Sequence, residues 1–480
     1  MLSIPRFQWP RLFGGPDNQR NRRAAPRGGS ACAWKSDRSA SRRIDFRVTL
    51  APAAVRPRQP FMPTFLATLA TLGAVAATLL CFLLGCQSWE HRRRTRNRLR
   101  EPVRENPARV ALIAPCKGIE PGLRDNLRRL FRQTHDNYEI VFVVESEHDP
   151  ACQVILSLIA EHAQPRAKLV VAGLAELGCQ KVHNLEAGVA AAGDAAEVLA
   201  FVDSDARPHA GWLSQLVQRL DDPGVGVSTG YRWFLPSTPT AAAAVLCNIN
   251  ATAASLYTPK TFQPVWGGSW AMRREVYEQI DLEGQWRGRL TDDLVATNVV
   301  LAAGLRVEFE PGCMVASPLE ATWSTMFAFL RRQYIIGRLY ARQWWSLALL
   351  ATTVNVLGFW GGALAAAVGV LSEADWAWAP AAACLAWYAV SAGRAWIRRD
   401  LARLYLPPLL EVRMARVYRI DVWAAPVIAA INWVAIVTTV ASRQMQWRDI
   451  QYELLPGGIA RVIRPAASSE QQQPRIARAA

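Results

Sequence analysis

Asp203 and Asp205 are the residues whose type and spacing most directly indicate chemistry in this chain. They follow Leu199 to Val202, an apolar run with the character of a β-strand. Buried parallel strands read as continuous apolar runs, and ligands of open α/β sheets lie beyond the carboxyl ends of the strands. Carboxylates there suit a hard divalent cation, Mg²⁺ or Mn²⁺, which in turn binds phosphate. The alternative is a turn, because Asp and Ser favour turns and Pro208 follows.

Two further segments can each be interpreted in two ways. Thr291-Asp292-Asp293 opens a predicted helix that runs to Gly304, so its carboxylates are candidates either for proton transfer or for capping the helix. Gly267 and Gly268 stand where the backbone must approach another group closely or where a turn needs positive φ.

The elements that must position these residues alternate between strands and helices, the pattern of a mostly parallel α/β sheet. The predicted strands are 110–114, 138–144, 168–172, 199–202, 224–229 and 306–309. The predicted helices are 123–133, 149–163, 181–191, 240–256 and 291–304.

An ordered series of motifs between residues 110 and 345 resembles the catalytic domain of family 2 inverting glycosyltransferases. Within that family the resemblance is to the ceramide glucosyltransferase-like branch with its bacterial lipid-glycosylating relatives. The matching segments are Pro115-Cys-Lys-Gly-Ile-Glu-Pro121, His148-Asp-Pro-Ala151, Lys181-x-x-Asn184, Asp203-x-Asp205 and Thr291-Asp292-Asp293. The resemblance implies a GT-A-type sheet that binds a nucleotide sugar.

The resemblance also implies roles for individual residues. Asp205 would bind the metal and Asp203 would orient ribose or metal. Asp293 would be the catalytic base, with Asp292 where the family usually has Glu. Inversion needs a base that accepts the acceptor hydroxyl's proton from the face opposite the leaving group. The expected substrate-binding residues are Pro115, Lys117, Glu145, Asp149, Lys181, Asn184, Asp203, Gly267, Gly268, Gln333 and Arg338.

One motif departs from the family pattern. The family usually carries Gln or Arg, two residues, then Arg-Trp before the chain returns to the membrane, whereas here Gln333 and Arg338 are five apart with no Arg-Trp. The two residues either contact diphosphate and acceptor in altered register or belong to a basic helix that flanks the membrane. The missing Trp argues against a processive, cellulose-like synthase.

Four apolar stretches predict membrane segments: 65–86, 346–371, 376–393 and 422–442. Arginine clusters at 91–100, 331–342 and 394–416 flank the first three. By the positive-inside rule these clusters are cytoplasmic, so we expect the segment from about 90 to 345 in the cytoplasm of an inner-membrane protein. A full fourth span would place the basic, aromatic tail outside. We therefore expect a re-entrant fourth stretch, an extra crossing near 401–412, or a local failure of the rule.

The first 61 residues differ from the rest because they carry thirteen Lys and Arg against three Asp. We expect a disordered or misannotated extension, with translation starting at Met62, and no nucleic-acid partner. The nine Cys have no metal-ligand spacing, which excludes a zinc site or disulfide scaffold. The expected organisation is an extension 1–61, a span 62–88, a glycosyltransferase domain 105–325, a membrane-proximal helix 326–345, a hairpin 346–393, a linker 394–421, a fourth stretch 422–442 and a tail 443–480.

The sequence thus favours a membrane-bound glycosyltransferase that moves one sugar, with a UDP-sugar as the favoured donor, to a lipid acceptor. A processive polysaccharide synthase and a catalytically inactive membrane scaffold of the same fold are the alternatives.

Overall fold

A seven-stranded sheet forms the centre of the computed structural model, which describes residues 61–163, 165–257, 263–447 and 450–463. The expected extension over 1–61 lies outside the described residues except for its last position. The strands follow the order β3-β2-β1-β4-β6-β5-β7. Their bounds are β1 Val110–Pro115, β2 Tyr138–Val144, β3 Arg166–Val171, β4 Val198–Val202, β5 Val225–Pro236, β6 Ser269–Arg273 and β7 Arg306–Leu319. All pairs are parallel except those of β6, which runs antiparallel to β4 and β5.

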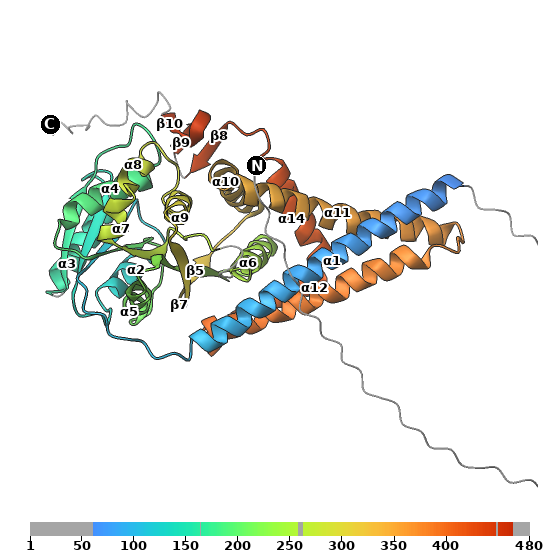
Figure 1. Cartoon of the computed structure of the whole chain (residues 1–480), viewed down its shortest axis with the longest axis horizontal. Coiled ribbons are helices and arrows are strands. Elements are labelled where there is room, and N and C mark those ends of the chain that lie inside the picture. Colours follow the sequence, from blue (N-terminus) through green and yellow to red (C-terminus); the bar gives the residue numbers. More distant parts are fainter. Residues whose placement is uncertain (1–60, 164, 258–262, 448–449, 464–480) are drawn as a thin grey trace, which may run out of the picture. The chain divides into compact units, whose positions relative to one another are not determined.

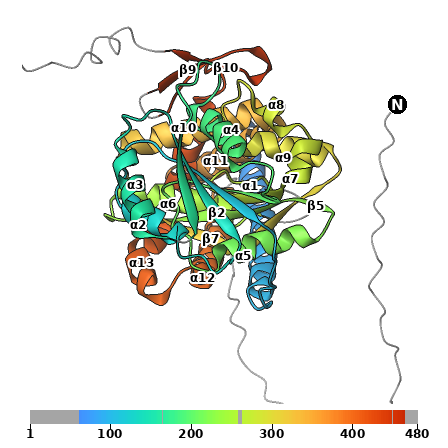
Figure 2. The same cartoon turned by 90° about the vertical axis from the view of Figure 1, so that its left-hand side faces the viewer.

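Helices cover both faces of this sheet (Figures 1 and 2). One face carries α2 Leu123–Leu130, α3 Ala151–Glu161 and α5 Trp212–Val217, and the other carries α4 Gln180–Ala192, α7 Arg274–Gln279, α8 Leu282–Trp286 and α9 Asp293–Ala302. Alternate residues of β1 enter the two cores, with Leu112 on the first face and Ile113 on the second. The mostly parallel sheet with flanking helices that the sequence predicts is therefore confirmed.

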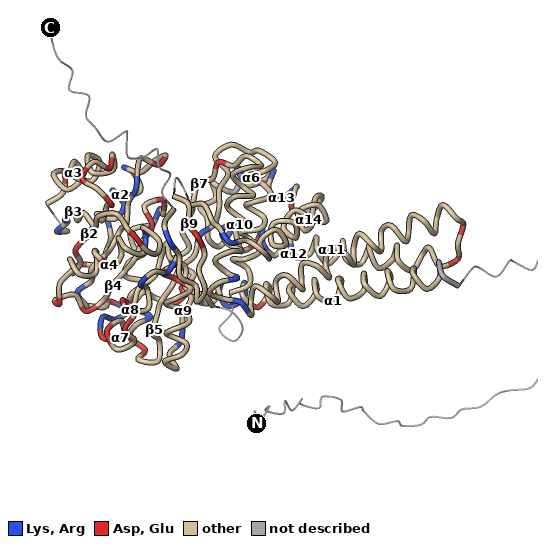
Figure 3. The backbone as a smooth tube through the Cα atoms, turned by 90° about the horizontal axis from the view of Figure 1, so that it is seen from above, with Lys and Arg blue, Asp and Glu red and all other residues tan. Residues whose placement is uncertain are grey.

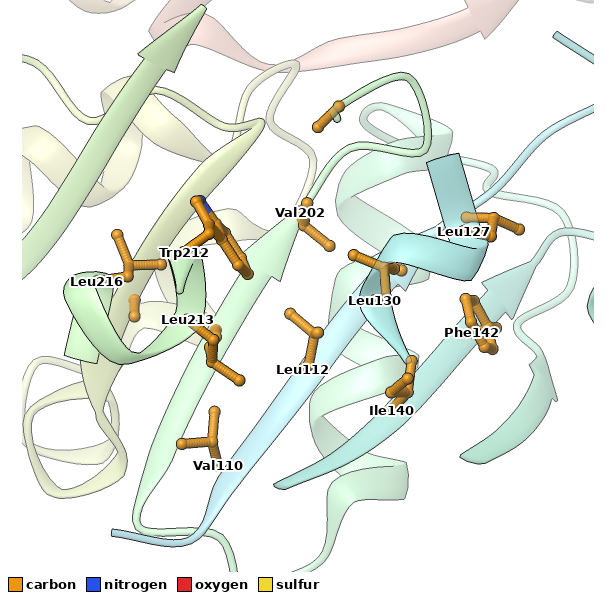
Figure 4. Close-up of a cluster of buried hydrophobic side chains, with 14 of the residues drawn as sticks. Val110, Leu112, Leu127, Leu130, Ile140, Phe142, Val202, Trp212, Leu213 and Leu216 are labelled. Atoms are coloured by element: carbon orange, nitrogen blue, oxygen red, sulfur yellow. The ribbon is translucent and has the colours of Figure 1, made fainter. Parts of the chain in front are cut away.

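Leucine spacing explains how α2 joins the first core. Leu123, Leu127 and Leu130 lie on one helix face and are buried. Figure 4 shows Leu127 and Leu130 against Leu112 and Phe142 of the sheet. Burying one such Leu side chain stabilises the fold by about 1.5–3 kcal/mol relative to leaving it exposed.

The membrane-proximal part consists of long helices joined to the sheet domain. Their bounds are α1 Phe61–Arg98, α6 Ala241–Ala254, α10 Trp323–Tyr340, α11 Arg342–Leu371, α12 Trp378–Tyr405, α13 Pro408–Trp423 and α14 Ala425–Val437. Figure 3 shows Lys and Arg concentrated in the sheet domain and at the near ends of the long helices, whose far parts are largely uncharged. A Cβ at Gly358 of α11 would clash with the carbonyl oxygen of Gly73 in α1, so a small residue lets these two helices pack closely.

Two of the described helices are long and apolar enough to cross a membrane, Thr64–Arg98 and Arg342–Leu371. They contain the first two predicted stretches. The third predicted stretch lies in α12, which is not one of these two helices. The fourth, 422–442, overlaps a helix pair, Val412–Trp423 and Ala425–Val437, and extends beyond its end. This pair is bent by 86° and would give a third span if it is counted as one.

A second sheet, absent from our sequence-based elements, lies in the predicted tail. It has the order β10-β9-β8, with β8 Gln444–Trp447, β9 Ile450–Leu454 and β10 Ala460–Ile463. Its backbone bonds to the loops before α4 and α9, where Gly178 N donates to Ala460 O and Ala460 N donates to Gly288 O, each at 2.9 Å. The strands β8, β9 and β10 of the predicted tail are thus part of the folded domain.

Candidate active site

The carboxyl ends of β1 and β4 meet the amino ends of α4 and α9 at one cavity of about 560 Å³. Its wall also includes residues from β5, α10, α11, β8 and β9. Ten of the predicted site residues line it: Pro115, Lys117, Lys181, Asn184, Asp203, Asp205, Gly267, Asp292, Asp293 and Gln333. Residues more than 200 positions apart in the sequence thus contribute to one cavity.

Lys181, in the first turn of α4, connects the two acidic segments of the cavity. Its Nζ lies 2.8 Å from Asp203 Oδ1 and 3.2 Å from Asp292 Oδ1. It also donates to Gly267 O at 3.0 Å. Burial alone would lower the pKa of Lys181, but the neighbouring carboxylates, Asp203 first, together raise it above its usual value. Lys181 therefore stays charged and fixes both carboxylates.

Asp292 has an unpartnered buried oxygen. Asp292 is only 3% exposed, and its Oδ2 has no hydrogen-bond partner among the described residues. Burial raises the pKa of Asp292 to about 7, and Lys181 opposes this shift. A Cβ at Gly267 would lie 2.8 Å from both Asp292 Oδ2 and Lys181 Nζ. Gly267 thus gives the backbone room for a close approach, one of the two roles expected of the paired glycines.

Asp293 is oriented by three donors. Its Oδ2 accepts from Gly267 N at 3.0 Å, and its Oδ1 accepts from Leu294 N at 2.7 Å and from the Thr291 hydroxyl. The carboxylate lies at the start of α9, is half-buried and lines the cavity. Asp292, at the N-cap position of α9, makes no side-chain cap hydrogen bond, so the capping interpretation is not observed. Proton transfer by Asp293 stays a prediction.

The carboxylates after β4 offer oxygen ligands for a divalent cation. Asp203 is half-buried and Asp205 is exposed, and both line the cavity. The described residues contain no group of three or more metal-ligating side chains. Mg²⁺ sites in nucleotide enzymes commonly use one or two carboxylates, with substrate phosphates completing the coordination. This donor set fits such a cation.

The loops after β1 and β2 place their polar groups differently. Lys117 Nζ lies 2.8 Å from both Glu145 oxygens, so Glu145 contacts Lys117 and is not a lining residue itself. Asp149 accepts from Gly118 N at 2.9 Å and from Ala151 N at 2.8 Å, which joins the two loops. Asp149 also lies outside the cavity wall.

Asn184 and Gly268 have local partners. Asn184 Oδ1 accepts from Gln180 Nε2 at 2.9 Å, one turn earlier in α4. A Cβ at Gly268 would lie 2.8 Å from Asp203 Oδ2, although Gly268 itself does not line the cavity. Both glycines of the pair therefore serve close packing, since neither has positive φ.

Gln333 and Arg338 lie on different sides of α10. Gln333 lines the cavity, whereas Arg338 donates to the backbone carbonyls of Val440 and Ser442 beyond α14 and is not a lining residue. Arg332, which our sequence analysis did not select, lines the cavity beside Gln333. The guanidinium carbon of Arg332 lies 4.9 Å from the Trp447 ring centre.

The tail sheet supplies a wall that sequence reasoning missed. Trp447, Ile450 and Tyr452 line the cavity, and Tyr452 is buried. Alternation of polar and apolar residues from Gln444 to Leu454 was the available signal, because such alternation is typical of half-buried strands.

A family model described as glycosyl transferase family 21 matches residues 69–460, which covers most of the chain, from within α1 to the start of β10. The chain belongs to glycosyl transferase family 21. The expected glycosyltransferase is therefore confirmed, and the mostly parallel sheet with flanking helices agrees with the expected fold class.

Curated relatives match over shorter stretches. Ceramide glucosyltransferase 1 of Caenorhabditis elegans is 32% identical over 90 residues, which cover 18% of this chain and 19% of that protein. Ceramide glucosyltransferase of Komagataella phaffii is 30% identical over 124 residues, 25% of this chain and 24% of that protein. The alignments thus span no more than about a quarter of these relatives.

Among solved structures, a mannosyltransferase from Pyrobaculum calidifontis in complex with GDP-Man and Mn²⁺ is similar with a TM-score of 0.46 and 17% identity. The match covers 74% of this chain and 99% of that structure.

Proposed function

We propose that this glycosyltransferase moves one sugar from a nucleotide diphosphate donor to a lipid acceptor, with inversion at the sugar carbon. The observation that carries the proposal is the convergence of Asp203, Asp205 and Asp293 on one cavity that continues to the start of α11. Carboxylates for a metal and a separate carboxylate for a base are the groups that such a transfer needs.

In the proposed reaction, the acceptor hydroxyl attacks the sugar carbon from the face opposite the diphosphate. The new carbon–oxygen bond forms as the bond to the diphosphate oxygen breaks, and the bonding electrons leave with the diphosphate. Asp293 accepts the hydroxyl proton, and its hydrogen bonds to Gly267 N and Leu294 N hold the carboxylate in place. A preoriented base contributes about 10²–10⁴-fold to the rate.

The remaining charged residues bind and orient. Asp205 and Asp203 would hold Mg²⁺ or Mn²⁺, which when bound stabilises negative charge on the departing diphosphate. Lys181 keeps the Asp203 carboxylate in position through its 2.8 Å ion pair. Lys117, Asn184, Gln333 and the backbone at Gly267 surround the donor and acceptor, because they line the same cavity.

The apolar end of the cavity supports a lipid acceptor. Trp344, Trp345 and Ala348, at the start of α11, line the cavity where this candidate span begins. Tryptophan is enriched where a membrane helix meets water, so this end of the cavity would lie at the membrane surface. An acceptor lipid would then present its hydroxyl to Asp293 while its chains stay in the bilayer.

The fourth stretch would be re-entrant, which would leave the sheet domain and the strands β8 to β10 on the same side of the membrane. The 86° bend before α14 and the backbone bonds of β10 to Gly178 and Gly288 support this arrangement. Together with the arginine clusters, this favours a multi-pass protein of the inner membrane whose catalytic domain and tail face the cytoplasm.

The test uses the full-length protein in membranes, supplied with UDP- and GDP-sugars, with a UDP-sugar expected, and with extracted membrane lipids. Mass spectrometry reads the product, and release of nucleoside diphosphate reads turnover. We expect one glycosylated lipid, loss of turnover on metal chelation, and a fall of about 10²–10⁴-fold in Asp293→Asn. Asp194→Asn, an exposed residue outside the cavity, is the matched control. A long polymer, or full activity of Asp293→Asn, would refute the proposal.

A further inference from the structure

Arg232 is a charged residue of the cavity wall that none of the recognised motifs contains. It lies in β5, and the neighbouring lining residues include Tyr231, Tyr257 and Trp266. β5 pairs with β7 along most of its length, including Arg232 with Val315, and with β6 only at Ser228 and Thr229. The residues that follow, Trp233 to Leu235, also pack in the core beside α6, α10 and α12. Arg232 therefore lies in the sheet next to the segment that packs against the membrane-proximal helices.

Aromatic rings surround the Arg232 guanidinium. Its central carbon lies 4.8 Å from the ring centre of Phe234, 5.1 Å from that of Phe329 and 5.6 Å from that of Trp266. Rings attract the cation through their π-electrons but offer no conventional acceptor for its in-plane N–H groups. The Nε atom is buried and has no hydrogen-bond partner among the described residues.

The two lysines of the cavity wall have carboxylate partners. Lys117 pairs with Glu145, and Lys181 pairs with Asp203 and Asp292. No ion pair of Arg232 is present within the described ranges. The positive charge of Arg232 and the N–H donors of its guanidinium are thus available to a ligand that enters the cavity.

We propose that Arg232 binds a phosphate-type anion at the membrane-proximal end of the cavity. A guanidinium matches the oxygens of a phosphate with two parallel hydrogen bonds, and the surrounding rings hold its plane without competing for these donors. The anion comes from one of two sources, the diphosphate of the donor or a phosphate on the head group of the acceptor lipid. The inference rests on the proposed glycosyl transfer for the identity of these two molecules.

The first measurement is binding of UDP and of inorganic pyrophosphate to the purified full-length protein by calorimetry. If the donor supplies the anion, Arg232→Gln weakens binding about tenfold or more, and Arg232→Lys recovers part of it because the charge returns. Arg399→Gln is the matched control, since the Arg399 guanidinium carbon also lies over a ring, 5.4 Å from the Tyr418 centre, but outside the cavity.

The second measurement is binding to lipid nanodiscs, with phosphatidylcholine alone or with added phosphatidic acid. If the acceptor supplies the anion, Arg232→Gln keeps wild-type affinity for UDP and loses the preference for phosphatidic acid, whereas Arg399→Gln keeps both. Wild-type binding by Arg232→Gln in both experiments, with only a lower unfolding temperature, would overturn the proposal and leave Arg232 a packing residue.

Failure of the proposed function is distinguishable from failure of this inference. Binding of UDP that depends on Arg232, without turnover of any sugar nucleotide, would retain the anion site and remove glycosyl transfer. Normal transfer with unchanged binding and unchanged KM values in Arg232→Gln would retain the transfer and remove the anion site.

Discussion

Two charge clusters in this protein each combine acidic and basic side chains around a buried carboxylate. The cavity cluster, Lys181 with Asp203, Asp292 and Asp293, has three carboxylates around one cation. The junction cluster lies where α1 joins the domain and has two cations, Arg219 and Arg98, beside the buried carboxylate of Glu310. These arginines also pair with Glu101 and Glu308.

The difference lies in what remains unpaired. Glu310 accepts from Arg219 and from Gly312 N, so both of its oxygens are satisfied within the fold. In the cavity cluster, Asp292 Oδ2 has no partner among the described residues and the carboxylates face a cavity. A buried carboxylate with both oxygens bonded inside the fold stabilises a junction, whereas a buried oxygen without such a partner leaves an acceptor for a group that enters the cavity. The internal partners of the buried carboxylate, more than its burial, therefore separate the two clusters.

Removing the central cation should have the largest effect. We expect Lys181→Met to lose about 3–5 kcal/mol of unfolding free energy, because Asp203 and Asp292 would be left without their buried partner. Thermal unfolding of the purified protein in detergent checks this. The double variant Lys181→Met, Asp292→Asn should recover part of the loss. An unchanged midpoint in the single variant would show that these carboxylates do not depend on Lys181 as their internal partner.

The raised pKa of Asp292, about 7, predicts a pH dependence of stability in metal-free buffer. In the unfolded chain an Asp titrates near 4, so below that pH the residue is protonated in both states. At higher pH the unfolded chain releases this proton more readily than the folded protein does. The free energy of unfolding therefore falls as pH rises from about 4 through about 7. We expect wild type to lose stability relative to Asp292→Asn between about pH 4 and 8, measured by chemical denaturation at each pH. Parallel curves for the two proteins would show that this carboxyl does not titrate as expected.

We expect the junction cluster to affect stability but not turnover. We expect Glu310→Gln to cost about 1–3 kcal/mol, because Glu310 accepts hydrogen bonds on both oxygens, from Arg219 and from Gly312 N, and Gln offers one acceptor oxygen, so that one donor loses its partner. Turnover per folded molecule should stay near that of wild type. A large fall in kcat without a change in unfolding temperature would give this cluster a role in the reaction and remove the contrast.

An exposed ion pair should contribute the least to stability. Arg306 and Asp222 form an ion pair with side chains 59% and 55% exposed. We expect Arg306→Gln to change stability by less than about 1 kcal/mol, since water and salt screen such pairs. A cost as large as that of Glu310→Gln would mean that burial does not separate these pairs.

Sequence reasoning predicted the elements that carry strong local patterns. The apolar runs before Pro115 and Asp203 gave β1 and β4 to within one residue, because buried parallel strands are apolar on both faces. The strand β6 was not predicted, since Ser269–Arg273 is short and follows two glycines that read as a turn. The sheet of β8 to β10 was missed because its apolar residues pack against distant loops, including Cys179 beside Tyr452.

The candidate site was predictable where residue type is unusual for its context, as with carboxylates directly after an apolar strand. Arg232 and Arg332 were not predictable in this way. Arg232 lies among aromatic residues that read as core, and Arg332 lies in a basic helix where the sequence does not distinguish a residue facing the cavity from one facing away. Which side a helical residue faces depends on the packing of α10 against α11 and α14, and only the fold supplies that packing.

The tail sheet has a consequence for the order of folding during synthesis. The ribosome makes β8, β9 and β10 after every other described element, yet Gly178 and Gly288 bond to Ala460 in that sheet. Until those strands emerge, the loops beside Lys181 and Asp292 lack their backbone partners and the cavity lacks the wall formed by Trp447 and Tyr452. The cavity is therefore completed only after the last of these strands has been synthesised.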